Sequence, residues 1–403
     1  MGTDWFADAI IYQVFIDRFS RGLSRDGSTP SCEGAVFCGG TIDGIVERLQ
    51  YLVDLGINTV WITPFNTTAA YHGYHVTDFF AVDPHFGTEQ SVQQLIERCH
   101  KLGLWLLMDF VANHVHRTHP FFLDALQNPA SKYRDWFHFT GPGSYLSFLD
   151  FDELPKLNLD NPDARAHVIE AALFWLDRGF DGFRLDHVIG PRLNFWRRFA
   201  REVKAKHHDA VLIGEASLAG VDWSHLKTID LRHKRLLLLL AKLGMDPSDL
   251  VMHQYVGILD GTLDFTFQSL MRRFIAERHW YLPRRLLPLM LRRHYRMFPK
   301  GFYLPSFLDN HDMSRFLFQA GQDVSRFKEA ARIQFVQSQP PVIYYGTEVG
   351  MTQDQPTSGG RPYSDLEARQ LMPWDPRHQN LELLKFYQDI ISDRRRRNAE
   401  NGR

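Results

Sequence analysis

The chain has 403 residues and is nearly neutral, with 46 Lys and Arg residues against 47 Asp and Glu residues, and 44% of its residues are hydrophobic. This length suits one large domain with an insertion, or two domains of ordinary size. The charge balance lacks the strong basic excess typical of proteins that bind nucleic acid, so no such partner is predicted. The N-terminal MGTDWFADAI has no basic and apolar signal-peptide pattern, and the longest apolar run, Leu236 to Ala241, is far too short to span a membrane. We therefore expect a soluble, cytoplasmic protein without a membrane partner.

The three cysteines, Cys32, Cys38 and Cys99, show no metal-binding spacing such as C-x-x-C. Cys32 and Cys38 are close enough in sequence to form a bridge. The small, odd number nevertheless favours reduced thiols in an intracellular compartment.

The first third of the chain alternates apolar strands with amphipathic helices. Strands are predicted at 9–16, 58–63 and 104–110, with helices at 41–55 and 88–102 between them. Near-continuous apolar strands in a β-α-β-α-β order indicate a parallel sheet covered by helices.

The alternation stops after the third strand. Residues 115–160 are rich in aromatic side chains but contain no long helical pattern, so they are predicted to form a short insertion domain. A helix begins at Asn161-Pro162, an N-cap followed by proline in the first turn. Further strands are predicted at 182–185, 211–213, 263–267, 302–307 and 341–345.

Eight strands with intervening helices favour a (β/α)8 TIM barrel formed by residues 1–114 and 161–403. A doubly wound sheet is the alternative, but no G-x-G-x-x-G follows the first strand. The last predicted helix, Leu381 to Arg394, ends the pattern, and no C-terminal β-sandwich is predicted.

The fourth strand carries an Arg two residues before an Asp, in GFRLD (182–186). This spacing places Arg184 and Asp186 on one face of the strand, where the cation should favour the ionised carboxylate and lower its pKa. Such a carboxylate suits a nucleophile, although a structural ion pair in the barrel interior has the same pattern.

Other polar residues also follow strands, where the functional groups of TIM barrels gather. Three carboxylates from different strands, Asp186, Glu215 and Asp312, could split a glycosidic bond, with one attacking and another protonating the leaving oxygen. Glu215 follows the apolar run VLIG, so its pKa should be raised. Four more residues complete the predicted site: Asp109, His114, His311 and Tyr74.

A metal-dependent hydrolase is a rival interpretation, because His114, His116 and His119 could form a metal cluster. Only His187 and His311 follow the later strands, which disfavours this reading.

Seven segments, in this order, resemble glycoside hydrolase family 13, the α-amylase family. They are residues 39–65, 108–114 (MDFVANH), 154–158 (LPKLN), 182–186, 214–216 (GEA), 307–312 (FLDNHD) and 340–350. The resemblance covers the chain from about Trp5 to Tyr387 and implies the same barrel.

The resemblance also implies roles. Asp186 would be the nucleophile, Glu215 the general acid/base, and Asp312 the carboxylate that stabilises the transition state. Arg184 would orient Asp186, and Asp109 would shape the site without reacting. His114 and His311 would bind sugar hydroxyls, and Tyr74 would stack against the sugar.

The implied activity is hydrolysis of α-1,4-linked glucans or maltooligosaccharides with retention of configuration. A 4-α-glucanotransferase, an exo-acting α-glucosidase and a sucrose-active enzyme are alternatives within the family. A partner subunit that has lost catalysis is disfavoured because all three acidic residues are present. The oligomeric state stays open.

Two departures from the family pattern concern the substrate and calcium. Ile189 and Gly190 stand where many members have Lys-His, and Lys156 stands where many have Asp, a variant similar to the neopullulanase-like and cyclomaltodextrinase-like branch. No cofactor is required by the implied chemistry. Calcium is possible, because Asn113 matches one of the family's calcium ligands.

Overall fold

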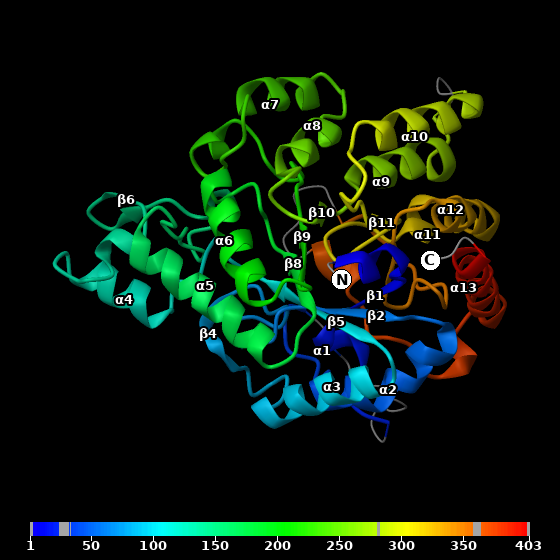
Figure 1. The fold of residues 1–403 in the computed structure, drawn as a ribbon, viewed down its shortest axis with the longest axis horizontal. Coiled ribbons are helices and arrows are strands. Elements are labelled where there is room, and N and C mark those ends of the chain that lie inside the picture. Colours follow the sequence, from blue (N-terminus) through cyan, green and yellow to red (C-terminus); the bar gives the residue numbers. More distant parts are fainter. Residues whose placement is uncertain (1–2, 24–31, 33, 280–282, 358–363, 401–403) are drawn as a thin grey trace.

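The computed structural model describes residues 3–23, 32, 34–279, 283–357 and 364–400. Its centre is a ring of eight parallel strands in the order β10-β9-β8-β5-β2-β1-β12-β11 (Figure 1). The strands are β1 (Ile11–Val14), β2 (Thr59–Ile62), β5 (Trp105–Phe110), β8 (Gly182–Leu185), β9 (Val211–Gly214), β10 (Gly261–Thr262), β11 (Ser306–Phe307) and β12 (Pro341–Tyr344). The ring closes where Gly261 of β10 bridges Tyr303, just before β11. The predicted (β/α)8 barrel is confirmed.

Helices cover the outside of the strands (Figure 1). They are α1 (Ile16–Phe19), α2 (Ile42–Leu55), α3 (Glu89–Lys101), α5 (Pro162–Asp177), α6 (Leu193–Lys206), α7 (Lys234–Lys242), α8 (Ser248–Met252), α9 (Phe265–Met271), α10 (Leu287–Arg296), α11 (Phe316–Gln319), α12 (Val324–Val336) and α13 (Leu381–Glu400). The predicted N-cap of α5 is present: the Asn161 side chain accepts hydrogen bonds from the backbone N–H groups of Asp163 and Ala164. No helix in the described residues is long and apolar enough to cross a membrane. These residues also contain no β-sandwich after β12.

The hydrophobic core has two parts because successive side chains of a strand point to opposite faces. Ile11 and Val342 lie in a cluster inside the ring, whereas their neighbours Tyr12 and Ile343 lie in the larger cluster between ring and helices. Alternation along strands that are buried on both faces explains their near-continuous apolar sequences.

The strand predicted at 263–267 is wrong. β10 is only Gly261–Thr262, and α9 begins at Phe265. Asp264 explains why a helix begins here instead of a strand continuing. Its side chain caps α9 by accepting a hydrogen bond from the Phe267 N–H at 2.8 Å. The strand predicted at 302–307 is likewise reduced to Ser306–Phe307.

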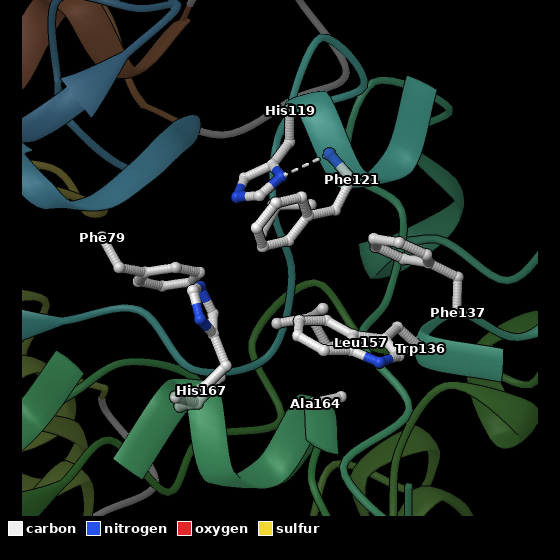
Figure 2. A pocket seen from close by; sticks show the side chains of 10 residues that line it. Phe79, His119, Phe121, Trp136, Phe137, Leu157, Ala164 and His167 are labelled. Atoms are coloured by element: carbon white, nitrogen blue, oxygen red, sulfur yellow. Dashed lines mark hydrogen bonds between the residues drawn. The ribbon is translucent and has the colours of Figure 1, made fainter. Parts of the chain in front are cut away.

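The segment between β5 and α5 extends to one side of the barrel, with α4 (Pro120–Gln127), β6 (Phe139–Gly141) and β7 (Ser144–Tyr145) (Figure 1). The hairpin of β3 (Asn66–Thr68) and β4 (Val76–Val82) lies beside it and contacts α5. Aromatic rings from the segment pack onto β4 and α5 around a cavity of about 10 Å³ (Figure 2). Such a cavity can hold at most about one water molecule, so the aromatic residues of this segment serve packing here.

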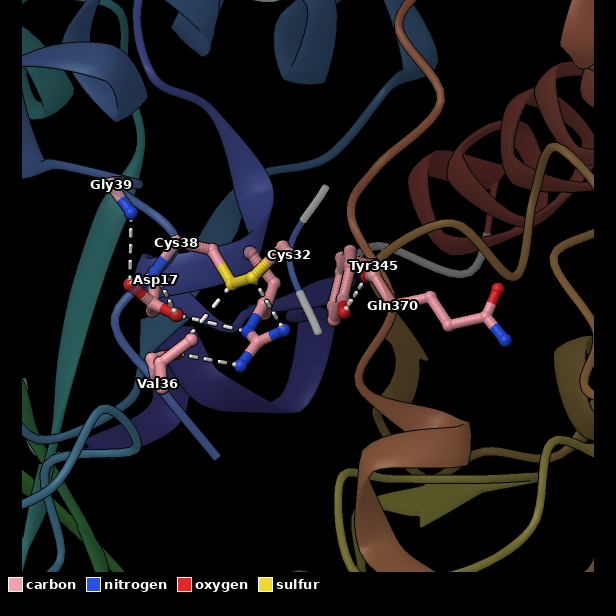
Figure 3. The surroundings of a disulfide bond; sticks show 8 residues. Asp17, Cys32, Val36, Cys38, Gly39, Tyr345 and Gln370 are labelled. Carbon is pink, nitrogen blue, oxygen red and sulfur yellow. Dashed lines mark hydrogen bonds and ion pairs between the residues drawn. A yellow bond between two sulfur atoms is a disulfide. The ribbon is translucent and has the colours of Figure 1, made fainter. Parts of the chain in front are cut away.

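Cys32 and Cys38 form a disulfide, which contradicts the expectation of reduced thiols, while Cys99 is free and buried (Figure 3). The bridge lies beside Arg18, whose Nη1 is 3.3 Å from the Cys32 sulfur. Asp17 accepts a hydrogen bond from the Cys38 N–H at 2.8 Å. The expectation of reduced thiols rested on the small, odd number of cysteines. The contacts with Arg18 and Asp17, which hold Cys32 and Cys38 close together, cannot be predicted from that number.

Candidate active site

Arg184 is the centre of a buried cluster at the carboxyl ends of three neighbouring strands. Its Nη1 lies 2.8 Å from Asp109 Oδ1 of β5 and 2.9 Å from Asp186 Oδ1, directly after β8. Its Nη2 forms an ion pair with Glu215 Oε1, after β9, at 2.9 Å. The parallel pairing of Asp109 with Arg184 creates this meeting point. We call these four residues the Arg184 cluster, which confirms the prediction that Arg184 and Asp186 share a face.

The protonation of the Arg184 cluster follows from one cation facing three carboxyl groups. Burial raises the pKa of Asp109 and of Asp186 to about 7, although Arg184 pulls both down. Burial likewise raises the pKa of Glu215, as predicted from its apolar strand. The expectation of a lowered pKa for Asp186 is therefore wrong, because desolvation and the neighbouring carboxylates outweigh the shared guanidinium.

Asp109 and Tyr74 form the inner wall of the site. Tyr74 donates a hydrogen bond from its hydroxyl to Asp109 Oδ2 at 2.8 Å, and Trp61 Nε1 donates to the same oxygen at 3.2 Å. The Tyr74 ring stacks on His311, with ring centroids 5.2 Å apart and planes 8° from parallel. One face of Tyr74 is thus occupied by His311.

Asp312 belongs to a second group on the other side of the mouth, with His311 and Arg369, which we call the Asp312 cluster. Arg369 Nη2 donates to Asp312 Oδ1 at 2.9 Å, and His311 Nε2 lies 3.1 Å from Asp312 Oδ2. Partial burial works to raise the pKa of Asp312, but His311, Arg369 and Arg184 together lower it. With 47% of its side chain exposed, Asp312 is ionised and accessible.

The two predicted sugar-binding histidines are neutral. Burial lowers the pKa of His114 and of His311 to about 3. Among the described residues, His114 Nε2 is buried without a hydrogen-bond partner. A neutral imidazole with an unused nitrogen can donate to or accept from a hydroxyl group.

The rival cluster of His114, His116 and His119 is not assembled. His119 caps α4 by accepting from the Phe121 N–H at 3.3 Å (Figure 2). Among the described residues, the group of potential metal ligands that contains His116 includes neither His114 nor His119.

The surroundings of Asn113 do not suit calcium. Lys156 places its ammonium group there, donating to the carbonyl oxygens of Gly190 at 2.5 Å and Thr228 at 2.6 Å. Asn113 Oδ1 is buried without a hydrogen-bond partner in the described chain, and it lies so close to Gly190 that a Cβ there would be 2.1 Å away. The Lys156 side chain already uses these carbonyl oxygens as hydrogen-bond acceptors, and they are the kind of oxygen that calcium would need as ligands.

Sequence reasoning missed Arg369 and Gln13, and it considered His187 only as a metal ligand. Gln13 Nε2 lies 2.7 Å from His311 Nδ1, which leaves Nε2–H of His311 to donate to Asp312. His187 has a φ of 42° and donates its N–H to Glu215 Oε2 at 3.1 Å. Gln13 lies on the first strand and His187 follows Asp186 directly, so barrel topology could have indicated both. Arg369 lies in a loop whose sequence gives no such indication.

Comparison with known proteins places this geometry in a family. The family model described as "Alpha amylase, catalytic domain" matches residues 13–401. Alpha-amylase 2 of Dictyoglomus thermophilum is 32% identical over 97% of this chain and 64% of its own length. A cyclomaltodextrinase of a Bacillus species is 33% identical over 96% of this chain and 65% of its own length. The chain therefore spans slightly less than two thirds of these relatives.

Solved structures agree with the sequence comparison. The cyclic α-maltosyl-(1→6)-maltose hydrolase of Arthrobacter globiformis superposes with a TM-score of 0.80 at 27% identity, covering 97% of this chain and 84% of that one. A cyclomaltodextrinase superposes with a TM-score of 0.80 at 30% identity, covering 98% and 64%. The shared barrel and the family match over almost the whole chain lead to one conclusion: this chain belongs to the alpha-amylase family.

Proposed function

We propose that the chain hydrolyses α-1,4-glucosidic bonds of maltooligosaccharides with retention of configuration. The observation that carries this proposal is the ion pairing of Asp186 and Glu215 with two nitrogens of one guanidinium. A retaining glycosidase needs two carboxyl groups roughly 5–5.5 Å apart, and a shared Arg holds such groups close together.

In the proposed mechanism, Asp186 attacks the anomeric carbon while Glu215 protonates the leaving oxygen. Water then releases the glycosyl group from Asp186, with Glu215 as base. The raised pKa of Glu215 suits the acid, and Arg184, which works to lower the pKa of Asp186, favours the ionised carboxylate that attacks. The ionised Asp312 suits stabilisation of the positive charge that develops on the sugar ring, and His114 and His311 would bind its hydroxyls.

Relatives support the substrate class. Their names include cyclomaltodextrinase, "Neopullulanase 2" of Thermoactinomyces vulgaris and "Intracellular maltogenic amylase" of Bacillus subtilis. We accordingly propose α-glucan oligosaccharides as the substrate partner. The intracellular relative supports a cytoplasmic location, whereas the Cys32–Cys38 disulfide is of a kind that is rare in that compartment. The contacts of Lys156 support our proposal that no calcium is required.

The activity test is a product time course on maltoheptaose, with a cyclomaltodextrin, maltose and sucrose as parallel substrates. Shorter oligomers as sole products, first released as the α-anomer in a proton NMR spectrum, are the expected result. Products longer than maltoheptaose would instead identify a glucanotransferase, and release of the β-anomer would contradict the retaining mechanism.

The acid assignment is tested with Glu215→Gln. This change removes the proton donor while keeping the side-chain shape, so activity on maltoheptaose should fall by about 10²–10⁴-fold. The matched control is Glu202→Gln on α6, a partly exposed residue that pairs with Arg198. Circular dichroism should show both variants folded, and wild-type activity in Glu215→Gln would refute the assignment.

A further inference from the structure

His75, His116 and Glu153 converge outside the catalytic clusters. Each offers one ligand atom, and these atoms all lie within 4.8 Å of one another. His75 directly precedes β4, His116 follows β5, and Glu153 lies near the end of the segment that extends from the barrel. Three separate parts of the chain thus meet at one point.

Backbone hydrogen bonds hold these three parts together. The His116 N–H donates to the Val76 carbonyl oxygen at 2.8 Å, next to His75. The Arg117 N–H donates to the carbonyl oxygen of Glu153 at 2.7 Å. Because the main chain sets the spacing, the meeting of the side chains does not depend on flexible surface residues alone.

The two imidazole rings lie beside each other. They lie nearly parallel, with centroids 5.3 Å apart and planes 13° from each other. Thr118 holds the His116 ring in place, because its Oγ1 lies 2.8 Å from Nδ1 and its backbone N–H donates to Nδ1 at 3.3 Å, which leaves Nε2 as the nitrogen available to a metal ion. Across the described residues, the His75 ring makes no hydrogen bond.

Both rings are also in the right protonation state. Burial lowers the pKa of His75 to about 4 and also lowers the pKa of His116. Neutral imidazole is the form that binds a metal ion, so neither ring carries a positive charge that would repel it.

We propose that His75, His116 and Glu153 bind a divalent transition-metal ion, with Zn²⁺ the best match. Two imidazole nitrogens and one carboxylate oxygen are a zinc donor set with a fourth position left for water, whereas Ca²⁺ and Mg²⁺ prefer oxygen ligands alone. Tetrahedral coordination needs ligand atoms about 3.3–3.5 Å apart. The three ligand atoms lie within 4.8 Å of one another, so small side-chain rotations have to bring them together on binding, and Glu153 is exposed and has room for such a rotation.

The ion would fasten the inserted segment to the loop before β4. That loop reaches the active site: the His75 ring contacts His72 edge-on at 4.6 Å, and the His72 ring centroid is 5.8 Å from that of Tyr74. The site is thus a structural clamp beside the catalytic centre and takes no part in bond cleavage.

The test is direct metal binding by the untagged, chelator-treated chain. Calorimetric titration with ZnCl₂ should give one equivalent bound, and Co²⁺ should give a visible absorption band that reports its coordination. Loss of an outer partner already costs 10–100-fold in affinity, so His75→Ala and His116→Ala should each weaken binding by more than about 100-fold. His208→Ala, which alters an exposed histidine elsewhere, is the matched control and should bind as the wild type does.

A second readout separates lost binding from lost folding. Zn²⁺ should raise the melting temperature of the wild type and of His208→Ala but not that of His75→Ala. If an alanine variant unfolds, His75→Gln replaces it. The proposal is overturned if both ligand variants still bind one equivalent of Zn²⁺ as tightly as the wild type. It is also overturned if the wild type binds neither ion saturably below about 0.1 mM.

Discussion

The two clusters at the barrel mouth shift the pKa values of their carboxyl groups in opposite directions. In the Arg184 cluster, one guanidinium serves three carboxyl groups that water barely reaches, and burial raises all their pKa values. In the Asp312 cluster, a single half-exposed carboxylate contacts His311 and Arg369, which it shares with Asp365, and its pKa is lowered. The number of cations per carboxylate and the access of water therefore decide which side can hold a proton and which stays charged.

Removing the shared cation should have the largest effect. Arg184→Met leaves three buried carboxyl groups without their guanidinium, which should cost about 3–5 kcal/mol of unfolding free energy in urea titrations. Activity on maltoheptaose should fall by at least about 10²-fold. Arg198→Met, which breaks an exposed ion pair with Glu202, should cost only about 0–1 kcal/mol. Equal losses in the two variants would show that Arg184 does not hold the cluster.

Arg369→Met should make the Asp312 cluster more like the Arg184 cluster, in which the pKa values of the carboxyl groups are raised. The hydrogen bond to Asp312 is worth about 1.5–3 kcal/mol, so kcat/KM should fall roughly 10–100-fold. Losing a cation raises the pKa of Asp312, so the acidic limb of the kcat/KM profile should move to higher pH. The exposed Arg377, paired with Asp375, supplies the control Arg377→Met, whose profile should match that of the wild type. An unmoved acidic limb in Arg369→Met would separate Arg369 from the ionisation of Asp312.

The disulfide supports the Asp312 cluster from outside, because Arg18 beside Cys32 lies 4.5 Å from the Tyr71 ring, and the Tyr71 hydroxyl accepts from Arg369. Replacing both Cys32 and Cys38 by Ser should cost about 2 kcal/mol of unfolding free energy, as for a short closed loop. Thiol titration of the denatured wild type should find one free thiol before reduction and three after it. Three free thiols before reduction would restore the expectation drawn from the sequence.

Lys156 supports the Arg184 cluster through Gly190, whose N–H donates to the His187 carbonyl oxygen. Burial lowers the pKa of Lys156 from 10.5 to about 7. Above pH 7 the unfolded chain therefore binds more protons at this residue than the folded chain, so stability should rise with pH until the unfolded lysine also titrates. Between pH 7 and 9 the wild type should gain about 1–2 kcal/mol relative to Lys156→Met in urea unfolding.

The control for this prediction is Lys385→Met, at an exposed lysine on α13 that should leave the pH slope unchanged. If Lys156→Met shows the same slope as the wild type, its ammonium group stays charged in the folded protein. Calcium added to chelator-treated protein should not raise the stability of any of the three proteins if Lys156 does the work that calcium does elsewhere in the family.

The sequence predicted the Arg184 cluster because all its members directly end strands or lie on them, and parallel neighbours bring such positions together. It failed where a single side chain overrules a pattern, as Asp264 does by starting α9 in an apolar run that also suits a strand. The raised pKa of Asp186 could not be predicted either. The sequence spacing identifies Arg184 as a neighbour of Asp186, but it does not show that two other carboxyl groups share the same guanidinium. Contacts across long sequence distances, such as Arg369 with Asp312, have no local pattern at all.

The close approach of Asn113 to Gly190 limits how this protein can change over evolutionary time. Any side chain at position 190 would collide with Asn113 Oδ1, and the Gly190 carbonyl oxygen is bound by Lys156. Positions 113, 156 and 190 are therefore epistatic: a substitution accepted at one alters which substitutions the other two can accept. A library that varies the three positions together should contain active combinations that no path of single substitutions reaches.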